Sequence, residues 1–174
     1  MRNIKEIDFD ELFGRLPELI QSAIIKCEQD PKYHPEGNCY NHIKLVFEYA
    51  KNTYEDADLM VCAIFHDMGK PETQRISARD TDYKGDPMLL ELKDLRISNI
   101  GHETKCRYYI NKYFDLFSDI STNKEKVIEI CEQHMRAHLY TDKKMSKKSK
   151  RNEFESLTYF NDIINFSNCD ENGK

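Results

Sequence analysis

The feature that most constrains this chain is the spacing of its apolar residues, which recur every three or four positions along most of its length. This spacing places them on one face of an α-helix and predicts amphipathic helices packed around a core. Strand-like alternation is scarce, and no internal repeat is present. Two clear stripes follow one another: Ile43, Val46, Phe47 and Ala50, then Ala57, Met60, Val61 and Ile64. The predicted fold class is therefore all-α, a single helical bundle.

The 174 residues fit one domain, and a chain of this length can bury a core without disulfides. We expect N-terminal helices within residues 1–29, one of them opening at Pro17 and running to about Cys27. Two prolines and a glycine predict a loop over Asp30–Asn38. A last helix is predicted from about Phe154 to Cys169.

One long irregular insertion is expected at residues 72–99, which are polar and contain Gly85 and Pro87. A connection of this length is too long for a tight turn and has room for a short hairpin or a lid. The helix before it should end in a left-handed cap at Gly69, with Pro71 preventing further helix. A second polar stretch, the cationic run Lys143–Arg151, is interpreted as a solvated loop, or else as a phosphate-attracting rim.

Charge and composition exclude several classes of protein. The net charge of −5 argues against a protein that coats nucleic acid through bulk electrostatics. No run of about 18 apolar residues exists, and the N-terminus is acidic where a signal peptide would be basic and then apolar. We therefore expect a cytoplasmic protein without membrane contact. The six scattered cysteines, never in a C-x-x-C pair, favour reduced core thiols over a zinc knuckle or a disulfide frame.

Several polar side chains fall on the inward faces or ends of the predicted helices. His134, for example, follows Val127 by seven residues and Cys131 by three, so its imidazole shares their apolar stripe. The polar residues placed in this way are His42, His66, Asp67, His102, His134 and Asp170. Any one histidine, or the His-Asp dipeptide alone, is weak evidence for a site. Their convergence on one apolar interior is what predicts one.

Burial of several imidazoles and carboxylates in one small core costs several kcal/mol unless they are paired or ligated, because each loses its hydration. A divalent metal ion removes that cost. Imidazole and carboxylate together suit Mn, Fe, Co, Ni or Zn, and carboxylate also accepts Mg. The sequence therefore predicts a metal centre.

Three segments resemble a known family: HPEGNCYNH (His34–His42), FHDMGKPET (Phe65–Thr73) and IGHE (Ile100–Glu103). In this order, followed by QHM and a late aspartate, they resemble the HD domain superfamily of metal-dependent phosphohydrolases. The nearest likeness is to the HD domain of bacterial CCA-adding tRNA nucleotidyltransferases, whose tail A-D-x-x-G-R resembles CDENGK here, with Lys174 replacing the arginine. The head domain of those enzymes is absent, so tRNA end synthesis is not implied. The insertion is also longer than the resemblance leads us to expect.

The resemblance implies roles for the inward residues. His42, His66, Asp67 and Asp170 would hold one metal ion, and His102 and His134 match the positions that hold a second one, with Asp67 as the bridge. A bound ion neutralises a phosphate ester and lowers the pKa of a coordinated water toward about 7.

Outside the ligands, Lys70 is the catalytic candidate beside Asp67, supplying positive charge to a phosphate oxygen. The alternative for Lys70 is a lysine favoured only by the negative end of the helix dipole. His138, one turn beyond His134, and Arg75 and Arg79 in the insertion are further candidates for substrate binding. His34 is expected to shape its loop.

Three functions are compatible with these patterns. The favoured one is hydrolysis of a small-molecule nucleotide or an RNA-end phosphate, as a phosphomonoesterase, a 2′,3′-cyclic phosphodiesterase or both. The second is release of triphosphate or pyrophosphate from a nucleoside triphosphate. The third is a non-catalytic nucleotide-binding module that keeps the ligands as a structural metal site.

Overall fold

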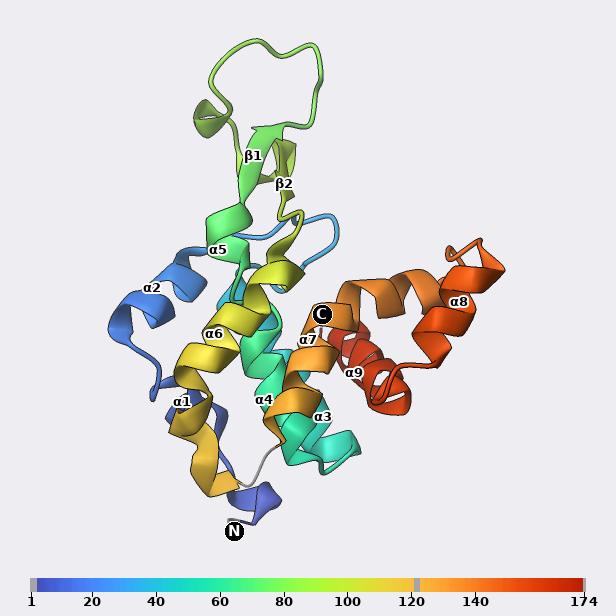
Figure 1. Cartoon of the computed structure of the whole chain (residues 1–174). Helices are drawn as coiled ribbons and strands as arrows, with labels where there is room; N and C mark the ends of the chain where they lie inside the picture. The colour runs from blue at the N-terminus through green and yellow to red at the C-terminus, as the bar shows by residue number, and fades with distance from the viewer. Residues whose placement is uncertain (1–2, 121–122, 174) are drawn as a thin grey trace.

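The computed structural model describes residues 3–120 and 123–173 and consists mainly of helices (Figure 1). The longer helices are α2 (Glu18–Lys26), α3 (Cys39–Thr53), α4 (Ala57–Phe65), α6 (Cys106–Tyr113), α7 (Lys124–Thr141), α8 (Lys148–Glu155) and α9 (Phe160–Asn172). Shorter helices are α1 (Phe9–Phe13), α5 (Lys70–Thr73) and the 3₁₀ segments η1 (Ile4–Glu6), η2 (Pro87–Leu89), η3 (Leu92–Asp94), η4 (His102–Lys105) and η5 (Phe114–Ile120). The predicted all-α class is confirmed. Within the described ranges, no helix is long and apolar enough to cross a membrane.

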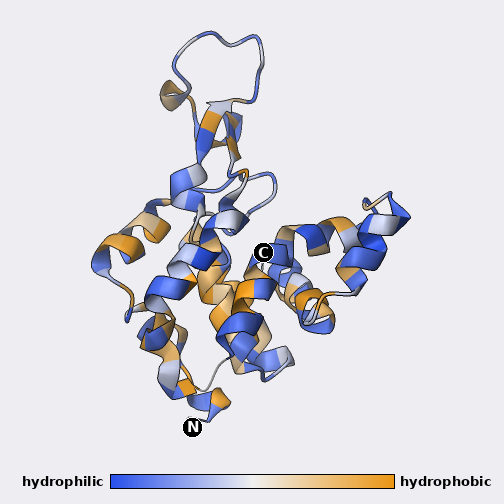
Figure 2. Ribbon diagram, viewed as in Figure 1, coloured by the Kyte–Doolittle hydropathy of each residue, from blue (hydrophilic) through white to orange (hydrophobic). Residues whose placement is uncertain are grey.

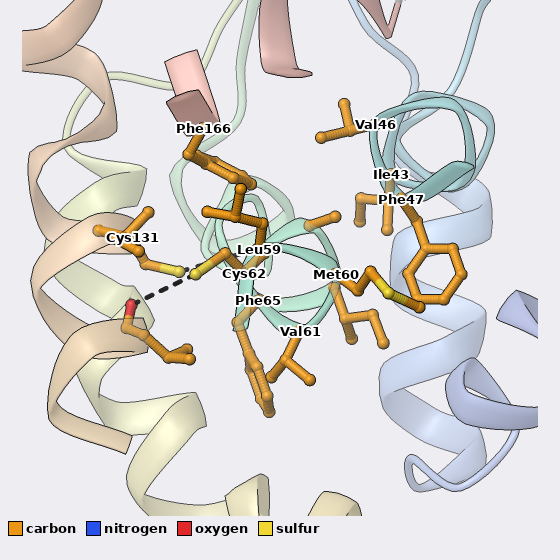
Figure 3. Close-up of a cluster of buried hydrophobic side chains, with 14 of the residues drawn as sticks. Ile43, Val46, Phe47, Leu59, Met60, Val61, Cys62, Phe65, Cys131 and Phe166 are labelled. Atoms are coloured by element: carbon orange, nitrogen blue, oxygen red, sulfur yellow. Dashed lines mark hydrogen bonds between the residues drawn. The ribbon is translucent and has the colours of Figure 1, made fainter. Parts of the chain in front are cut away.

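Helix α4 lies at the centre of the molecule, where hydrophobic residues are concentrated (Figure 2). Every residue from Leu59 to Phe65 is buried, as expected for a helix that is apolar on all sides. Helix α3 packs along α4, and α7 and α9 cover its other sides. In Figure 3, Val46, Cys131 and Phe166 come from these three helices and converge on α4. The cysteines are buried free thiols, as predicted.

Polar caps fix where the core helices begin. The side chain of Asn38 accepts a hydrogen bond from the backbone N–H of Asn41 and starts α3. His42 therefore lies in the first turn of α3, beside the preceding loop. Asp56 accepts hydrogen bonds from two backbone N–H groups in the first turn of α4. That helix then ends at Phe65, which places His66 and Asp67 at the end of the buried core.

The insertion contains a two-stranded antiparallel hairpin, as expected. Strand β1 (Arg75–Ala78) pairs with β2 (Leu95–Ser98), with Arg75 opposite Ser98. The hairpin projects from the helical body, and residues 79–94 lie at its far end (Figure 1). The segment therefore forms an arm that points away from the helices. Ile97 in β2 and Asn99 just after it line the cavity described below.

Gly69 does not form the predicted left-handed cap. Its φ of −78° and ψ of −12° are right-handed, and Pro71 lies in the first turn of α5 instead of ending a helix. The glycine is required for a different reason. A Cβ at this position would lie 2.3 Å from the carbonyl oxygen of His102 and 2.7 Å from Cβ of Lys105. The missing side chain thus allows η4 to pass close enough to bring His102 to Asp67.

Gly69→Ala should lower the free energy of unfolding by about 1–3 kcal/mol, because the added methyl group pushes η4 outward. It should also weaken metal binding by displacing His102. Urea denaturation and metal titration would measure the two effects. Gly14→Ala is the matched control, since its Cβ would approach only Asp10 and Glu11 backbone oxygens near its own helix. Equal metal affinities in the two variants would contradict this account.

The predicted helix Phe154–Cys169 is wrong in one respect, because the chain turns between Glu155 and Phe160. The rings of Phe154 and Phe160 both contact Tyr140, with centroid distances of 5.4 and 5.6 Å. On a continuous helix, residues six apart would point about 120° away from each other. The turn lets both rings reach one neighbour. The cationic run is likewise only partly a loop, since α8 begins at Lys148.

Candidate metal centre

The structure brings together the polar residues that were predicted to face inward. They come from the first turn of α3, the end of α4, η4, α7 and the last turn of α9. All six are buried: His42, His66, Asp67, His102, His134 and Asp170. A cavity of about 520 Å³ opens onto Asp67, His102, His134 and Asp170 from outside.

Two groups of ligand atoms meet at Asp67. In the first, His42 Nε2 lies 2.9 Å from Asp170 Oδ1 and 3.4 Å from His66 Nε2. Asp67 Oδ2 is 3.4 Å from His66 Nε2. In the second, His102 Nε2 lies 3.2 Å from Asp67 Oδ1 and 3.1 Å from His134 Nε2. Each oxygen of Asp67 therefore faces a different group, and Asp67 would offer a ligand to each of two cation positions.

The proton positions on the four imidazoles follow from their second nitrogens. Each Nδ1 lies within hydrogen-bond distance of a backbone carbonyl oxygen. The distance is 3.0 Å from His42 to Gly173 and 2.9 Å from His66 to Ala63. It is 2.7 Å from His102 to Asn99 and from His134 to Cys131. A carbonyl only accepts, so Nδ1 carries the proton and Nε2 of the neutral ring has a lone pair. When both rings of a pair are neutral, their Nε2 atoms face one another as acceptors without a donor between them. A bound cation would satisfy both pairs, so the residues present fit a metal centre.

Comparison with known proteins agrees with this geometry. The HD domain family matches residues 39–158, more than half of the chain. The chain belongs to the HD domain family. This places it in a superfamily of metal-dependent phosphohydrolases. The matched range includes all the predicted ligands except Asp170. No curated protein and no solved structure matches the chain.

Electrostatics differ between the histidines of this HD centre. Burial lowers the pKa of His134 to about 3, and the charges at His66 and His102 act in the same direction. Burial also opposes protonation of His42, but hydrogen bonds with Asp170 and Glu36 raise its pKa to about 9. A proton on His42 thus substitutes for positive charge that a metal ion would bring.

Lys70 lies within the HD cavity, not on a solvent-facing helix end. Its ammonium is 2.6 Å from Asp67 Oδ2 and donates a hydrogen bond to Gln29 Oε1. The side chain is buried, and although desolvation opposes charge, the neighbouring Asp67 raises the pKa of Lys70. The lysine is therefore a fixed positive charge beside the HD aspartate. A lysine favoured only by the negative end of a helix dipole would not need to be buried in this way.

The three remaining predicted substrate-binding residues have different positions. His138 lines the cavity, and its Nε2 is 2.6 Å from Asp170 Oδ2. Arg75 and Arg79 do not belong to the described wall of the cavity. Arg79 instead donates to Asp30 Oδ1 at 2.8 Å and to the Leu95 carbonyl at 2.7 Å, which ties the arm to the loop before α3. The geometry gives their proposed phosphate contact no support.

Sequence reasoning missed the role of the loop before α3. Glu36 Oε1 lies 3.0 Å from His42 Nδ1 and 2.8 Å from His34 Nδ1, and its side chain is 4% exposed. Its other oxygen is buried without a hydrogen-bond partner among the described residues. His34 also lines the cavity, beyond shaping its loop as expected. Loop residues show no periodicity. The short HPEGN segment before His42 was therefore the available sign that His34 and Glu36 belong to the site.

Glu36→Gln should weaken metal binding by about 10- to 100-fold, because the carboxylate behind His42 increases the basicity of its Nε2. Competition with a chelator for Mn²⁺ would measure this affinity. Glu28→Gln, eight positions earlier and exposed, removes the same charge away from the site. Identical Mn²⁺ affinities in the two variants would show that Glu36 only supports the loop.

Proposed function

We propose that this HD protein hydrolyses the phosphate ester of a nucleotide or an RNA end, as a phosphomonoesterase, a 2′,3′-cyclic phosphodiesterase, or both. One observation carries the proposal. Two pairs of histidines, each with its Nε2 atoms close together, lie on either side of the Asp67 carboxylate, which lines an open cavity. The likeness of HPEGN, HDMGKP and GHE to the HD domain of CCA-adding enzymes supports an RNA-end or nucleotide substrate over an unrelated ester.

His42, His66, Asp67 and Asp170 would hold one divalent ion, and His102 and His134 would hold a second together with Asp67. The chemistry of these donors suits Mn, Fe, Co, Ni or Zn, with Mg possible at the carboxylates. When bound, such an ion supplies charge neutralisation to the phosphate and acidity to a coordinated water.

The protein side chains supply orientation and further charge. Lys70 fixes a positive charge beside Asp67, where it stabilises negative charge that moves onto phosphate oxygens in the transition state. His138 holds the second oxygen of Asp170 and so fixes the orientation of that carboxylate. Burial lowers the pKa of His34 to about 4, so it is neutral at pH 7. With Nδ1 held by Glu36, its Nε2 can accept a hydrogen bond from a substrate hydroxyl.

The test is metal analysis of the purified protein, followed by a product assay on nucleotides and 2′,3′-cyclic phosphates with Mn²⁺, Ni²⁺, Co²⁺ and Mg²⁺. We expect bound divalent metal, and either orthophosphate or an opened cyclic ester as product. Release of triphosphate or pyrophosphate would favour the second enzymatic function instead. A metal-loaded protein that turns over no phosphate ester would overturn the proposal in favour of a binding module.

A further inference from the structure

Outside the predicted ligands, the carboxylates on the cavity wall are more numerous than the cations. Glu103, Asp142 and Glu171 line the cavity. Asp142 forms an ion pair with Lys144 at 2.6 Å, whereas Glu103 lies 3.7 Å from the Nδ1 of His102 and Glu171 is exposed beside Asp170. The outer wall of the cavity is therefore acidic.

Positive charge is confined to the bottom of the cavity. In the part of the chain that the structure describes, Lys70 is the one lysine or arginine on the wall, and it is already within 2.6 Å of Asp67. Arg79 is held by Asp30. Arg151 of the cationic run donates to the carbonyl oxygen of Met145. Among the described residues of the wall, no second lysine or arginine is in place to receive another phosphate group.

The mouth of the cavity also carries apolar side chains. Tyr33, Ile100 and Met135 line it, with exposed fractions of 61, 81 and 41%. These side chains offer contact area to a planar or apolar group, and none of them can neutralise an anion.

Resting on the proposed function, we infer that the cavity selects phosphate esters with a single phosphorus group and an uncharged, partly apolar body, and rejects nucleoside diphosphates and triphosphates. This narrows the proposed substrates to small nucleotides and leaves out RNA ends, whose chain carries further phosphate charges. One phosphate reaches the metal centre and Lys70, and the rest of the substrate lies against the apolar mouth. Each further phosphate would meet carboxylates at short range, where like charges repel, without the arginine or lysine partners that such chains need. The wall thus rejects the wrong substrate by repulsion.

Calorimetry on the Mn²⁺-loaded protein tests this inference without requiring turnover. The probes are a nucleoside 5′-monophosphate and the 5′-triphosphate of the same base, with Mn²⁺ in excess over nucleotide. We expect the monophosphate to bind at least tenfold more tightly. Equal or tighter binding of the triphosphate, or no monophosphate binding, would overturn the inference. A protein that binds with this preference but hydrolyses no ester would overturn only the proposed function.

Variants of the wall test its cause. The double variant Glu103→Gln, Glu171→Gln should reduce the preference for monophosphate at least threefold, because triphosphate binding improves. Glu125→Gln removes one carboxylate at an exposed position in the first turn of α7, outside the wall, and should leave the preference unchanged. A double variant that keeps the full preference would show that the acidic wall does not select the substrate.

Discussion

Asp67→Ala should abolish bound metal and hydrolysis together. The two oxygens of Asp67 face two separate groups of imidazoles, at 3.4 Å from His66 Nε2 and 3.2 Å from His102 Nε2. Their loss removes a ligand from both cation positions and leaves Lys70 without its carboxylate partner. We expect kcat/KM to fall by at least about 10³-fold, roughly 4 kcal/mol of transition-state stabilisation.

Elemental analysis and phosphate release would measure this result. Asp67→Asn, which keeps the size of the side chain, is the companion variant in case the alanine variant does not fold, and it should also lose most of its metal. Circular dichroism would show that either variant is folded. Full metal content with an unchanged rate in a folded variant would mean that the centre lies elsewhere.

His134→Ala should remove one ion and leave the other. His134 is buried and neutral, and its Nε2 lies 3.1 Å from His102 Nε2, whereas His42 and Asp170 belong to the other group. The expected metal content falls from two ions to about one per chain, and His102→Ala should behave in the same way. His138→Ala is the control on the same helix, and at saturating metal it should retain both ions. Unchanged stoichiometry in both His134 and His102 variants would assign these histidines to substrate binding or to the core.

Helical periodicity explains why much of the candidate site could be predicted from the sequence. His134 shares a stripe with Val127 and Cys131, and all three are buried. The same reasoning placed His42 and Asp170 inward, and both are buried. The position of a residue on a helix determines where its side chain points. A polar residue on an apolar stripe is therefore carried into the interior together with its apolar neighbours.

Features that depend on contacts between distant segments could not be predicted in this way. Gly69 looked like a helix cap because Pro71 follows it, but a glycine is needed there because the backbone of His102, which is distant in sequence, passes close to it. The turn between α8 and α9 depends on the aromatic contacts with Tyr140. Glu36 lies in a loop, where no periodicity indicates which way a side chain points. Arg79 was a candidate phosphate contact from its charge, and its ion pair with Asp30, far away in the sequence, could not be read from that charge.

The pairing of His42 with Asp170 also has a consequence for the stability of the fold. These residues are 128 positions apart, and the six cysteines form no disulfide. A metal ion between them would therefore act as the cross-link that this fold otherwise lacks, closing a loop over most of the chain. An ion that binds only the folded chain stabilises it by about 2.7 kcal/mol at a hundredfold excess over its Kd. Because Asp170 lies in α9 and His42 in α3, such an ion would tie the last described helix to the first turn of α3, and losing the ion would release both ends of that loop together.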